Sequence, residues 1–269
     1  MLGPALLFCP ADRPDRYAKA AAAADMVILD LEDAVGEDRK ESARGCVLAT
    51  SLDPERTIVR VNPIGAAHFE ADLAMLSRTS YRMVMVAKCE RPDDLAALAG
   101  FEVIALCETP LGVENAGRLA QEAEVVALMW GAEDLVGALG GRSSRTADGY
   151  RDVARYARSR VLIAAGAAGK AAIDSVVMEI GDLDRLAGEV EDAAAVGFAA
   201  TACIHPSQVA VIRRGYAPTV AEIEWAERVL EAADTNPGVF RFEGRMVDGP
   251  VLVQARTVMA RRIQDSGRG

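Results

Sequence analysis

The chain has 269 residues and a net charge of −10 at pH 7, with 51% hydrophobic and 26% charged residues. This length suits one barrel of roughly 250 residues or two small domains, and the composition is that of a folded globular protein. The negative charge argues against nucleic acid as a general partner, and no apolar run approaches the roughly 20 residues of a membrane-spanning helix.

The N-terminal residues predict a first strand rather than a targeting segment. They lack a basic region and turn polar after Cys9 and Pro10, unlike a signal peptide. Five cysteines, an odd number, lie mostly in apolar runs, which favours free thiols and a cytoplasmic protein. With no CxxC pair and only two histidines, a zinc site is not expected.

Short apolar runs alternate with amphipathic helical stretches along most of the chain, which is typical of βα repeats. Eight such runs fit a closed barrel better than an open sheet, so the predicted fold is an α/β protein, a (β/α)8 TIM barrel. Pro14 and Pro92 are expected to begin two of the intervening helices. The predicted strands are residues 5–10, 26–33, 57–62, 82–89, 103–109, 125–134, 172–178 and 198–206.

The division expected along the chain is a barrel at 1–216 and a C-terminal extension at 217–269. The extension reads as a helix, a small hairpin turning at Glu243-Gly244, and a last helix. Because a barrel closes without it, the extension is a candidate lid or oligomer contact. Within the barrel, the glycines of 137–149 predict a mobile loop.

Charged side chains stand at the ends of the predicted strands, where they would be costly to bury without partners. The C-terminal ends of parallel barrel strands meet on one rim, so these side chains are expected to share one polar site. They are Asp30, Glu32, Asp33, Arg60, Lys88, Glu108, Glu133, Asp134 and His205.

Glu108 and Asp134 are the best candidates for metal ligands, since each directly follows a core strand. Carboxylate oxygens from different strands are the usual protein ligands of Mg²⁺, which fills its remaining positions with water and substrate oxygens. The alternative is that both residues only cap the helices that follow them.

Arg60 is the candidate carboxylate clamp, because a guanidinium binds a carboxylate through two parallel hydrogen bonds. Its alternative role is a structural ion pair with Glu32 or Asp33. Lys88 could form a Schiff base if desolvated, or could pair with the surrounding acids. His205 could transfer a proton or could be a hydrogen-bonded residue at the end of its strand.

Two further features are ambiguous on their own. Arg13, Arg16 and Lys19 form a basic cluster that is either a solvated face or a phosphate site. Asp248, in the tail hairpin, is far from the rim in sequence and alone would pass as a turn residue.

The stretches LDLEDAV, RVNP, CETPLGV, WGAEDL and IHPSQV, in that order, resemble the citrate lyase β-subunit-like branch of the HpcH/HpaI aldolase family. The resemblance covers nearly the whole chain. The family is similar to malyl-CoA and citramalyl-CoA lyases. It therefore implies a Mg²⁺-dependent (β/α)8 barrel, often a homotrimer, and a carbon–carbon lyase (an oxo-acid lyase) acting on 3-hydroxyacyl-CoA thioesters.

The resemblance also implies roles for individual residues. Glu108 and Asp134 would bind Mg²⁺, and Arg60 would hold the 2-keto acid. Glu32 and Asp33 would support the metal waters and the substrate. Asp248 would act as an acid/base from a neighbouring subunit. Arg13 and Lys19 would contact the nucleotide end of coenzyme A.

Three functions remain open on the sequence. The first is a lyase acting alone on an acyl-CoA and a 2-keto acid. The second is a β subunit that acts on an acyl-carrier thioester inside a citrate lyase complex. The third is a non-catalytic barrel scaffold, which would be expected to lack some of the metal or clamp residues.

Overall fold

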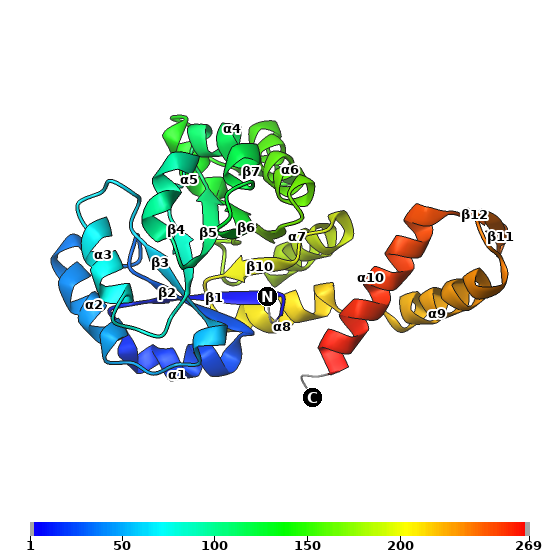
Figure 1. Cartoon of the computed structure of the whole chain (residues 1–269), viewed down its shortest axis with the longest axis horizontal. Coiled ribbons are helices and arrows are strands. Elements are labelled where there is room, and N and C mark those ends of the chain that lie inside the picture. Colours follow the sequence, from blue (N-terminus) through cyan, green and yellow to red (C-terminus); the bar gives the residue numbers. More distant parts are fainter. Residues whose placement is uncertain (1–2, 267–269) are drawn as a thin grey trace. The chain divides into compact units, whose positions relative to one another are not determined.

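The computed structural model describes residues 3–266, which form two compact units that divide between Ile212 and Arg213. The first unit is a barrel and the second is a small helical unit (Figure 1). Within the described residues, none of the helices is both long enough and apolar enough to cross a membrane.

Eight parallel strands close the barrel in the order β1-β10-β9-β6-β5-β4-β3-β2, which confirms the predicted (β/α)8 fold. Each strand pairs with its sequence neighbours in the barrel, as expected for successive βα repeats. The barrel strands are β1 (Ala5–Pro10), β2 (Met26–Asp30), β3 (Thr57–Val61), β4 (Met83–Val86), β5 (Glu102–Cys107), β6 (Val125–Trp130), β9 (Ala171–Asp174) and β10 (Ala200–Cys203).

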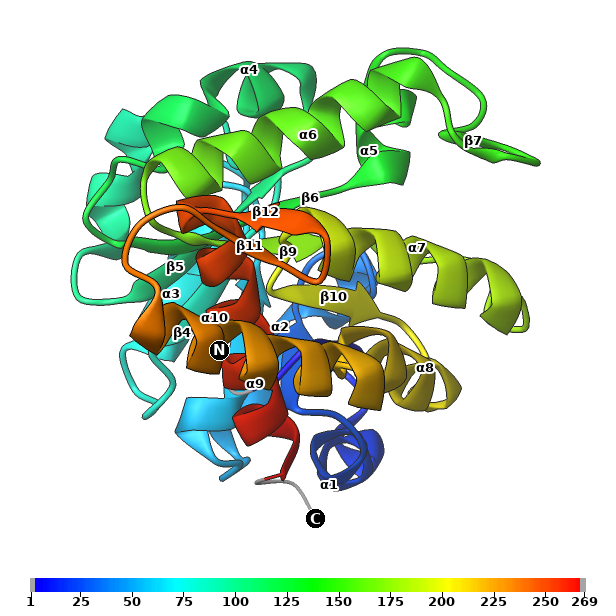
Figure 2. The same cartoon turned by 90° about the vertical axis from the view of Figure 1, so that its right-hand side faces the viewer.

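Helices surround the barrel, and α4 lies beside α6 on its outer face (Figure 2). Pro14 begins α1 as predicted, whereas Pro92 begins a short 3-10 helix, η3, in place of an α-helix. The helices that begin in this unit are α1 (Pro14–Ala23), η1 (Glu37–Arg39), α2 (Lys40–Leu48), η2 (Pro54–Arg56), α3 (Phe69–Leu76), η3 (Pro92–Leu98), α4 (Pro110–Leu119), α5 (Ala132–Ala138), α6 (Asp152–Ala167), α7 (Leu183–Val196) and α8 (Pro206–Tyr216), of which α8 continues past the division at Ile212.

The barrel interior is filled by apolar side chains from alternating strand positions, as in other closed barrels of this size. The barrel interior is therefore a packed core rather than a pore. The buried core residues are Leu6, Met26, Ile28, Ile58, Met85, Ile104, Leu106, Ala127, Met129, Ile173, Ala200 and Ala202.

Every barrel strand except β1 ends earlier than the sequence predicted, and the difference matters for the rim. β2 ends at Asp30 because the Asp30 carboxylate accepts hydrogen bonds from the backbone N–H of Glu32 (2.9 Å) and of Ala34 (3.2 Å). This local turn competes with the strand ladder. β6 ends at Trp130, so Asp134 lies in the first turn of α5 and not in the strand.

The glycine-containing stretch 137–149 includes part of a short hairpin, β7 (Arg145–Thr146) with β8 (Gly149–Tyr150). The predicted loop is therefore partly replaced by paired strands. Arg145 is 7% exposed, so this segment carries a buried charge that its glycines did not suggest.

The second unit contains α9 (Val220–Thr235), β11 (Phe240–Phe242), β12 (Arg245–Val247) and α10 (Gly249–Ser266), the predicted helix-hairpin-helix. Thr219 and Glu222 form a reciprocal capping box at the start of α9. Glu243 and Gly244 adopt positive φ angles of 46° and 82°, as a two-residue hairpin turn requires. A small apolar core of its own, built around Ala226, Val229, Val247 and Ala255, holds the two helices and the hairpin together.

Candidate active site

A cavity of about 350 Å³ lies at the C-terminal ends of the barrel strands, and six of the nine predicted charged residues line it. The other three, Glu32, Lys88 and His205, are not among its lining residues. Both polar and apolar side chains line it. Its lining residues are Phe8, Pro10, Asp30, Asp33, Ala34, Arg60, Leu106, Glu108, Met129, Gly131, Ala132, Glu133, Asp134, Ser175, Val176, Met178 and Ile204.

Glu108 and Asp134 both line this cavity. Glu108 directly follows β5 and is 3% exposed, and its Oε1 accepts a hydrogen bond from the backbone N–H of Lys88 at 3.0 Å. Burial, and then the negative charge of Asp134, raise the pKa of Glu108 to about 8. The two carboxylates repel each other, and this repulsion is not fully compensated. Binding of a cation beside them is therefore favourable.

Neither carboxylate occupies the N-cap position of the helix that follows it. α4 is capped by Thr109, whose hydroxyl accepts a hydrogen bond from the backbone N–H of Gly112 at 3.1 Å. The N-cap residue of α5 is Gly131. Helix capping therefore does not account for Glu108 and Asp134.

The donor set of this cavity fits Mg²⁺. Residues 3–266 hold no cluster of three or more His, Cys, Asp or Glu residues suited to a metal ion. The described side chains would therefore provide only part of the coordination of a metal at this site. Mg²⁺ uses one or two carboxylates and takes water or substrate oxygens for its other positions. Glu108 and Asp134, facing a cavity, could supply those two carboxylates.

Arg60 lies on β3 and lines the cavity, but its guanidinium is already engaged by acids. Its Nε and one terminal nitrogen donate to the two oxygens of Asp30 at 2.7 and 2.6 Å, and the other terminal nitrogen lies 3.1 Å from Glu32. The guanidinium carbon lies 4.9 Å from the ring centre of Phe8. The main ion-pair partner is thus Asp30, which the sequence alternative did not name. Of the two partners that it did name, Glu32 is confirmed by its contact with Arg60.

The Lys88 ammonium contacts acids that follow two strands, β2 and β6. Its Nζ contacts Glu32 and lies 3.3 Å from Asp33 and 3.4 Å from Asp134. Burial alone would lower the pKa of Lys88, but Glu32, Glu108 and Asp134 raise it above its ordinary value. A charged amine is a poor Schiff-base nucleophile, so the ion-pair role is favoured. Lys88 also has a φ of 49°, which is uncommon for a residue other than glycine.

Arg13 and Lys19 do not line the cavity. Arg13 makes two hydrogen bonds of 3.0 Å to Asp15, and Lys19 is exposed on α1. His205 is exposed, and its Nδ1 contacts the hydroxyl of Ser207 at 2.8 Å at the start of α8. The hydrogen-bonding role is therefore the one seen for His205.

Asp248 belongs to the second unit. There it precedes α10, and its carboxylate accepts a long hydrogen bond from the backbone N–H of Val251 at 3.4 Å. Its contacts within the unit are those of a helix-start residue.

The sequence interpretation gave no role to Lys40, which is 4% exposed. Its Nζ donates to the backbone oxygens of Leu31 (2.8 Å) and Glu32 (2.7 Å) and to Oδ1 of Asn62 (2.9 Å). Lys40 thereby holds the segment after β2 in place. The sequence offered no indication of this role, because Lys40 ends the acidic motif and a lysine beside acids usually indicates a solvated face.

These features define the class of protein as a (β/α)8 barrel with a candidate Mg²⁺ and carboxylate site at its C-terminal rim. The particular family follows from a family model described as HpcH/HpaI aldolase/citrate lyase, which matches residues 5–206. The chain belongs to this family, which confirms the family predicted from the motifs.

Individual relatives agree with that membership. A citrate lyase subunit beta-like protein of Mycobacterium tuberculosis is 53% identical over 260 residues, which cover 96% of this chain and 95% of that protein. The crystal structure of protein CitE from Mycobacterium tuberculosis in complex with magnesium, acetoacetate and coenzyme A has a TM-score of 0.93 and 53% identity, covering 97% and 98% of the two chains. A mitochondrial citramalyl-CoA lyase of Rattus norvegicus is 28% identical, covering 95% and 84%.

Proposed function

We propose that the protein is a Mg²⁺-dependent carbon–carbon lyase that cleaves or forms a 3-hydroxyacyl-CoA thioester of the malyl-CoA, citramalyl-CoA or citryl-CoA type. Cleavage would release acetyl-CoA or a related acyl-CoA and a 2-keto acid such as glyoxylate, pyruvate or oxaloacetate. The reverse reaction would join the same two compounds. The observation that carries the proposal is the convergence of Glu108, Asp134 and Arg60 on one cavity. Magnesium and coenzyme A in the similar Mycobacterium tuberculosis structure support it.

Glu108 and Asp134 would hold the metal. When bound, Mg²⁺ supplies Lewis-acid polarisation of a substrate oxygen. Glu108 is buried, which holds its carboxylate in a fixed position. Asp134 is more exposed and provides the second carboxylate from α5. Lys88 limits the negative charge by contacting Asp134.

Arg60 would bind the carboxylate of the 2-keto acid. Asp30 and Glu32 hold its guanidinium in one plane against Phe8, so it is oriented before the substrate arrives. A preoriented clamp lowers the entropic cost of positioning the substrate. Glu32 and Asp33, both in contact with Lys88, would support the metal waters and the substrate.

The remaining parts of the proposal concern the tail and the assembly. Asp248 would exchange the proton at the α-carbon of the acyl-CoA from a neighbouring subunit of a cytoplasmic homotrimer. The extension 217–269 would then serve as a lid or oligomer contact on the barrel of 1–216. Arg13 and Lys19, on or beside α1, would contact the nucleotide end of coenzyme A.

The test is cleavage by the purified protein alone. Malyl-CoA, citramalyl-CoA and citryl-CoA are each supplied with Mg²⁺ or with EDTA, and the release of free acyl-CoA and 2-keto acid is measured. Cleavage of at least one thioester with Mg²⁺, and none with EDTA, is expected. Equal turnover in EDTA would contradict the metal role, and Mg²⁺ binding without turnover would favour a β subunit that needs partner subunits.

A further inference from the structure

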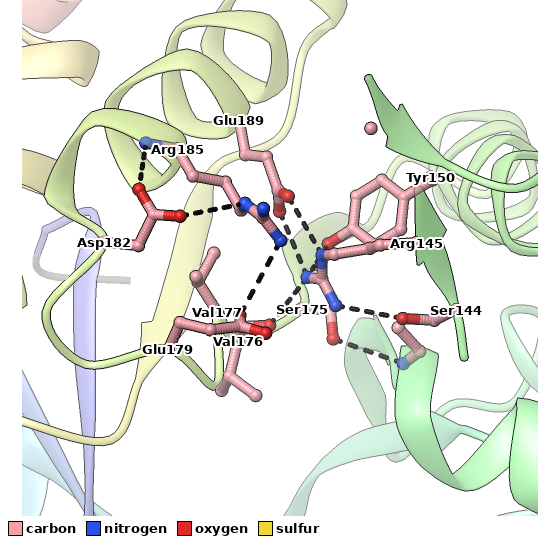
Figure 3. A network of polar contacts seen from close by, with 12 residues as sticks. Ser144, Arg145, Tyr150, Ser175, Val176, Val177, Glu179, Asp182, Arg185 and Glu189 are labelled. Carbon is pink, nitrogen blue, oxygen red and sulfur yellow. Dashed lines mark hydrogen bonds and ion pairs between the residues drawn. The ribbon is translucent and has the colours of Figure 1, made fainter. Parts of the chain in front are cut away.

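Arg145 is a buried arginine next to the cavity wall but not part of the lining. Its guanidinium donates to the hydroxyl of Tyr150 (2.5 Å), to the backbone oxygen of Val176 (3.0 Å) and to both oxygens of Glu189 (3.0 and 3.1 Å) (Figure 3). It also donates to Glu133 (2.6 Å). The guanidinium carbon also lies 4.2 Å from the ring centre of Tyr150.

Two of these partners belong to the segments that form one side of the cavity. Glu133 is adjacent in sequence to Asp134, and Val176 lies in the loop after β9. The two segments also touch directly, because the backbone N–H of Ala132 lies 3.3 Å from the hydroxyl of Ser175. Arg145 therefore joins the start of α5 to the loop after β9.

The other two partners anchor Arg145 away from the cavity. Glu189 comes from α7, and Tyr150 from β8 packs edge-on against Trp130, with ring centres 5.0 Å apart. Burial alone would lower the pKa of Arg145, but Glu189, Tyr150 and Glu133 raise it above its ordinary value, so the guanidinium remains charged. A planar guanidinium can satisfy several partners in fixed directions, which an ammonium cannot do.

We propose that Arg145 is a positioning residue for the metal side of the cavity. It holds Glu133 and Val176 so that the first turn of α5 presents the Asp134 carboxylate in one orientation. This inference rests on the proposed function, because it assumes that Asp134 binds Mg²⁺. A group that orients a metal ligand without touching the metal typically changes metal affinity about 10- to 100-fold when it is removed.

The test compares Arg145→Lys with Arg56→Lys in the full-length protein. Arg56 also donates to backbone oxygens of other segments, those of Asp25 (3.0 Å) and Ala24 (2.9 Å), but at the N-terminal ends of the strands. Hydrogen exchange of the segments 131–136 and 175–179 is followed by mass spectrometry without metal, and Mg²⁺ affinity is measured by titration calorimetry.

For Arg145→Lys we expect faster exchange in both segments and a Mg²⁺ affinity lower by about tenfold. For Arg56→Lys neither measurement should change. Unchanged exchange in Arg145→Lys overturns the proposal, and so does faster exchange with unchanged Mg²⁺ affinity, since Arg145 would then serve stability alone.

Two further results are also decisive. If Arg145→Lys does not fold, Tyr150→Phe removes a single hydrogen bond to Arg145, and unchanged exchange and Mg²⁺ affinity in that variant overturn the proposal. If the wild-type protein binds no Mg²⁺, the proposed function fails separately. The exchange measurement then decides alone whether Arg145 holds the two segments.

Discussion

A Cβ atom at Gly131 would lie 2.6 Å from Oε2 of Glu108 and 2.7 Å from its Cβ. Real Cβ atoms do not approach other atoms so closely. The Glu108 side chain is buried, and the backbone at Gly131 is held between the end of β6 and the start of α5, so neither can move away easily. The absence of a side chain at Gly131 therefore allows Glu108 its position in the cavity.

We expect Gly131→Ala to weaken Mg²⁺ binding by about tenfold, because the added methyl group must displace the Glu108 carboxylate. Titration calorimetry on the purified variant measures the change. Gly137→Ala is the matched control, since Gly137 lies within α5 and a methyl group added there would meet no atom within 4 Å outside its own helix. The control should keep wild-type affinity, and an equal loss in both variants would refute the steric explanation.

Mg²⁺ binding should become weaker as the pH falls below about 8. In the metal-free protein, the pKa of Glu108 is raised to about 8 by burial and by Asp134, so at neutral pH this carboxyl group is mostly protonated. A metal ligand must be ionised, so binding releases that proton. Between pH 7.5 and 6, the affinity should fall by about tenfold for each pH unit.

Calorimetry in two buffers of different ionisation enthalpy measures both the affinity and the number of protons released. Glu108→Gln should bind Mg²⁺ more weakly at every pH and should lose the proton release, because glutamine does not titrate. A wild-type affinity that stays constant from pH 6 to 8 would show that Glu108 is already ionised before the metal binds.

The fold could be predicted from sequence because the barrel repeats a single local pattern eight times. Each apolar run is a core strand, and the charges that interrupt these runs mark the rim, so the cavity location followed from parallel strands alone. Strand ends were less predictable. Asp30 and the residues after it read as a continuing strand, but the Asp30 carboxylate binds backbone N–H groups and turns the chain.

The supporting residues of the site could not be predicted, because their partners come from elements far apart in sequence. Lys40 binds backbone oxygens of the segment after β2, which no side-chain pattern records. Arg145 lies in a glycine-containing stretch, yet it contacts Glu189, 44 residues away. The sequence showed a charged residue at Asp30, but it did not show that Asp30 pairs with Arg60.

Asp30→Ala should lower the free energy of unfolding by about 3 kcal/mol, because it leaves the buried Arg60 without its principal partner. Urea denaturation measures this change. Asp15→Ala is the control, since Asp15 makes the same two-bond contact with Arg13 at the surface. Exposed pairs contribute little to stability, so the control should unfold like the wild type. A similar loss in both variants would indicate that burial does not distinguish the two pairs.

Asp248→Asn should abolish most lyase turnover while leaving Mg²⁺ affinity unchanged, because Asp248 is proposed to move a proton rather than to bind metal. If the tail acts from a neighbouring subunit, mixing Asp248→Asn with Glu108→Gln protein should restore activity that neither variant has alone. With random exchange of subunits, about a quarter of the sites would combine a wild-type barrel with a wild-type tail. Wild-type turnover by Asp248→Asn would remove the proton-transfer role. An inactive variant that the mixture fails to rescue, despite subunit exchange verified by mass spectrometry, would instead place Asp248 in the same chain as the cavity it serves.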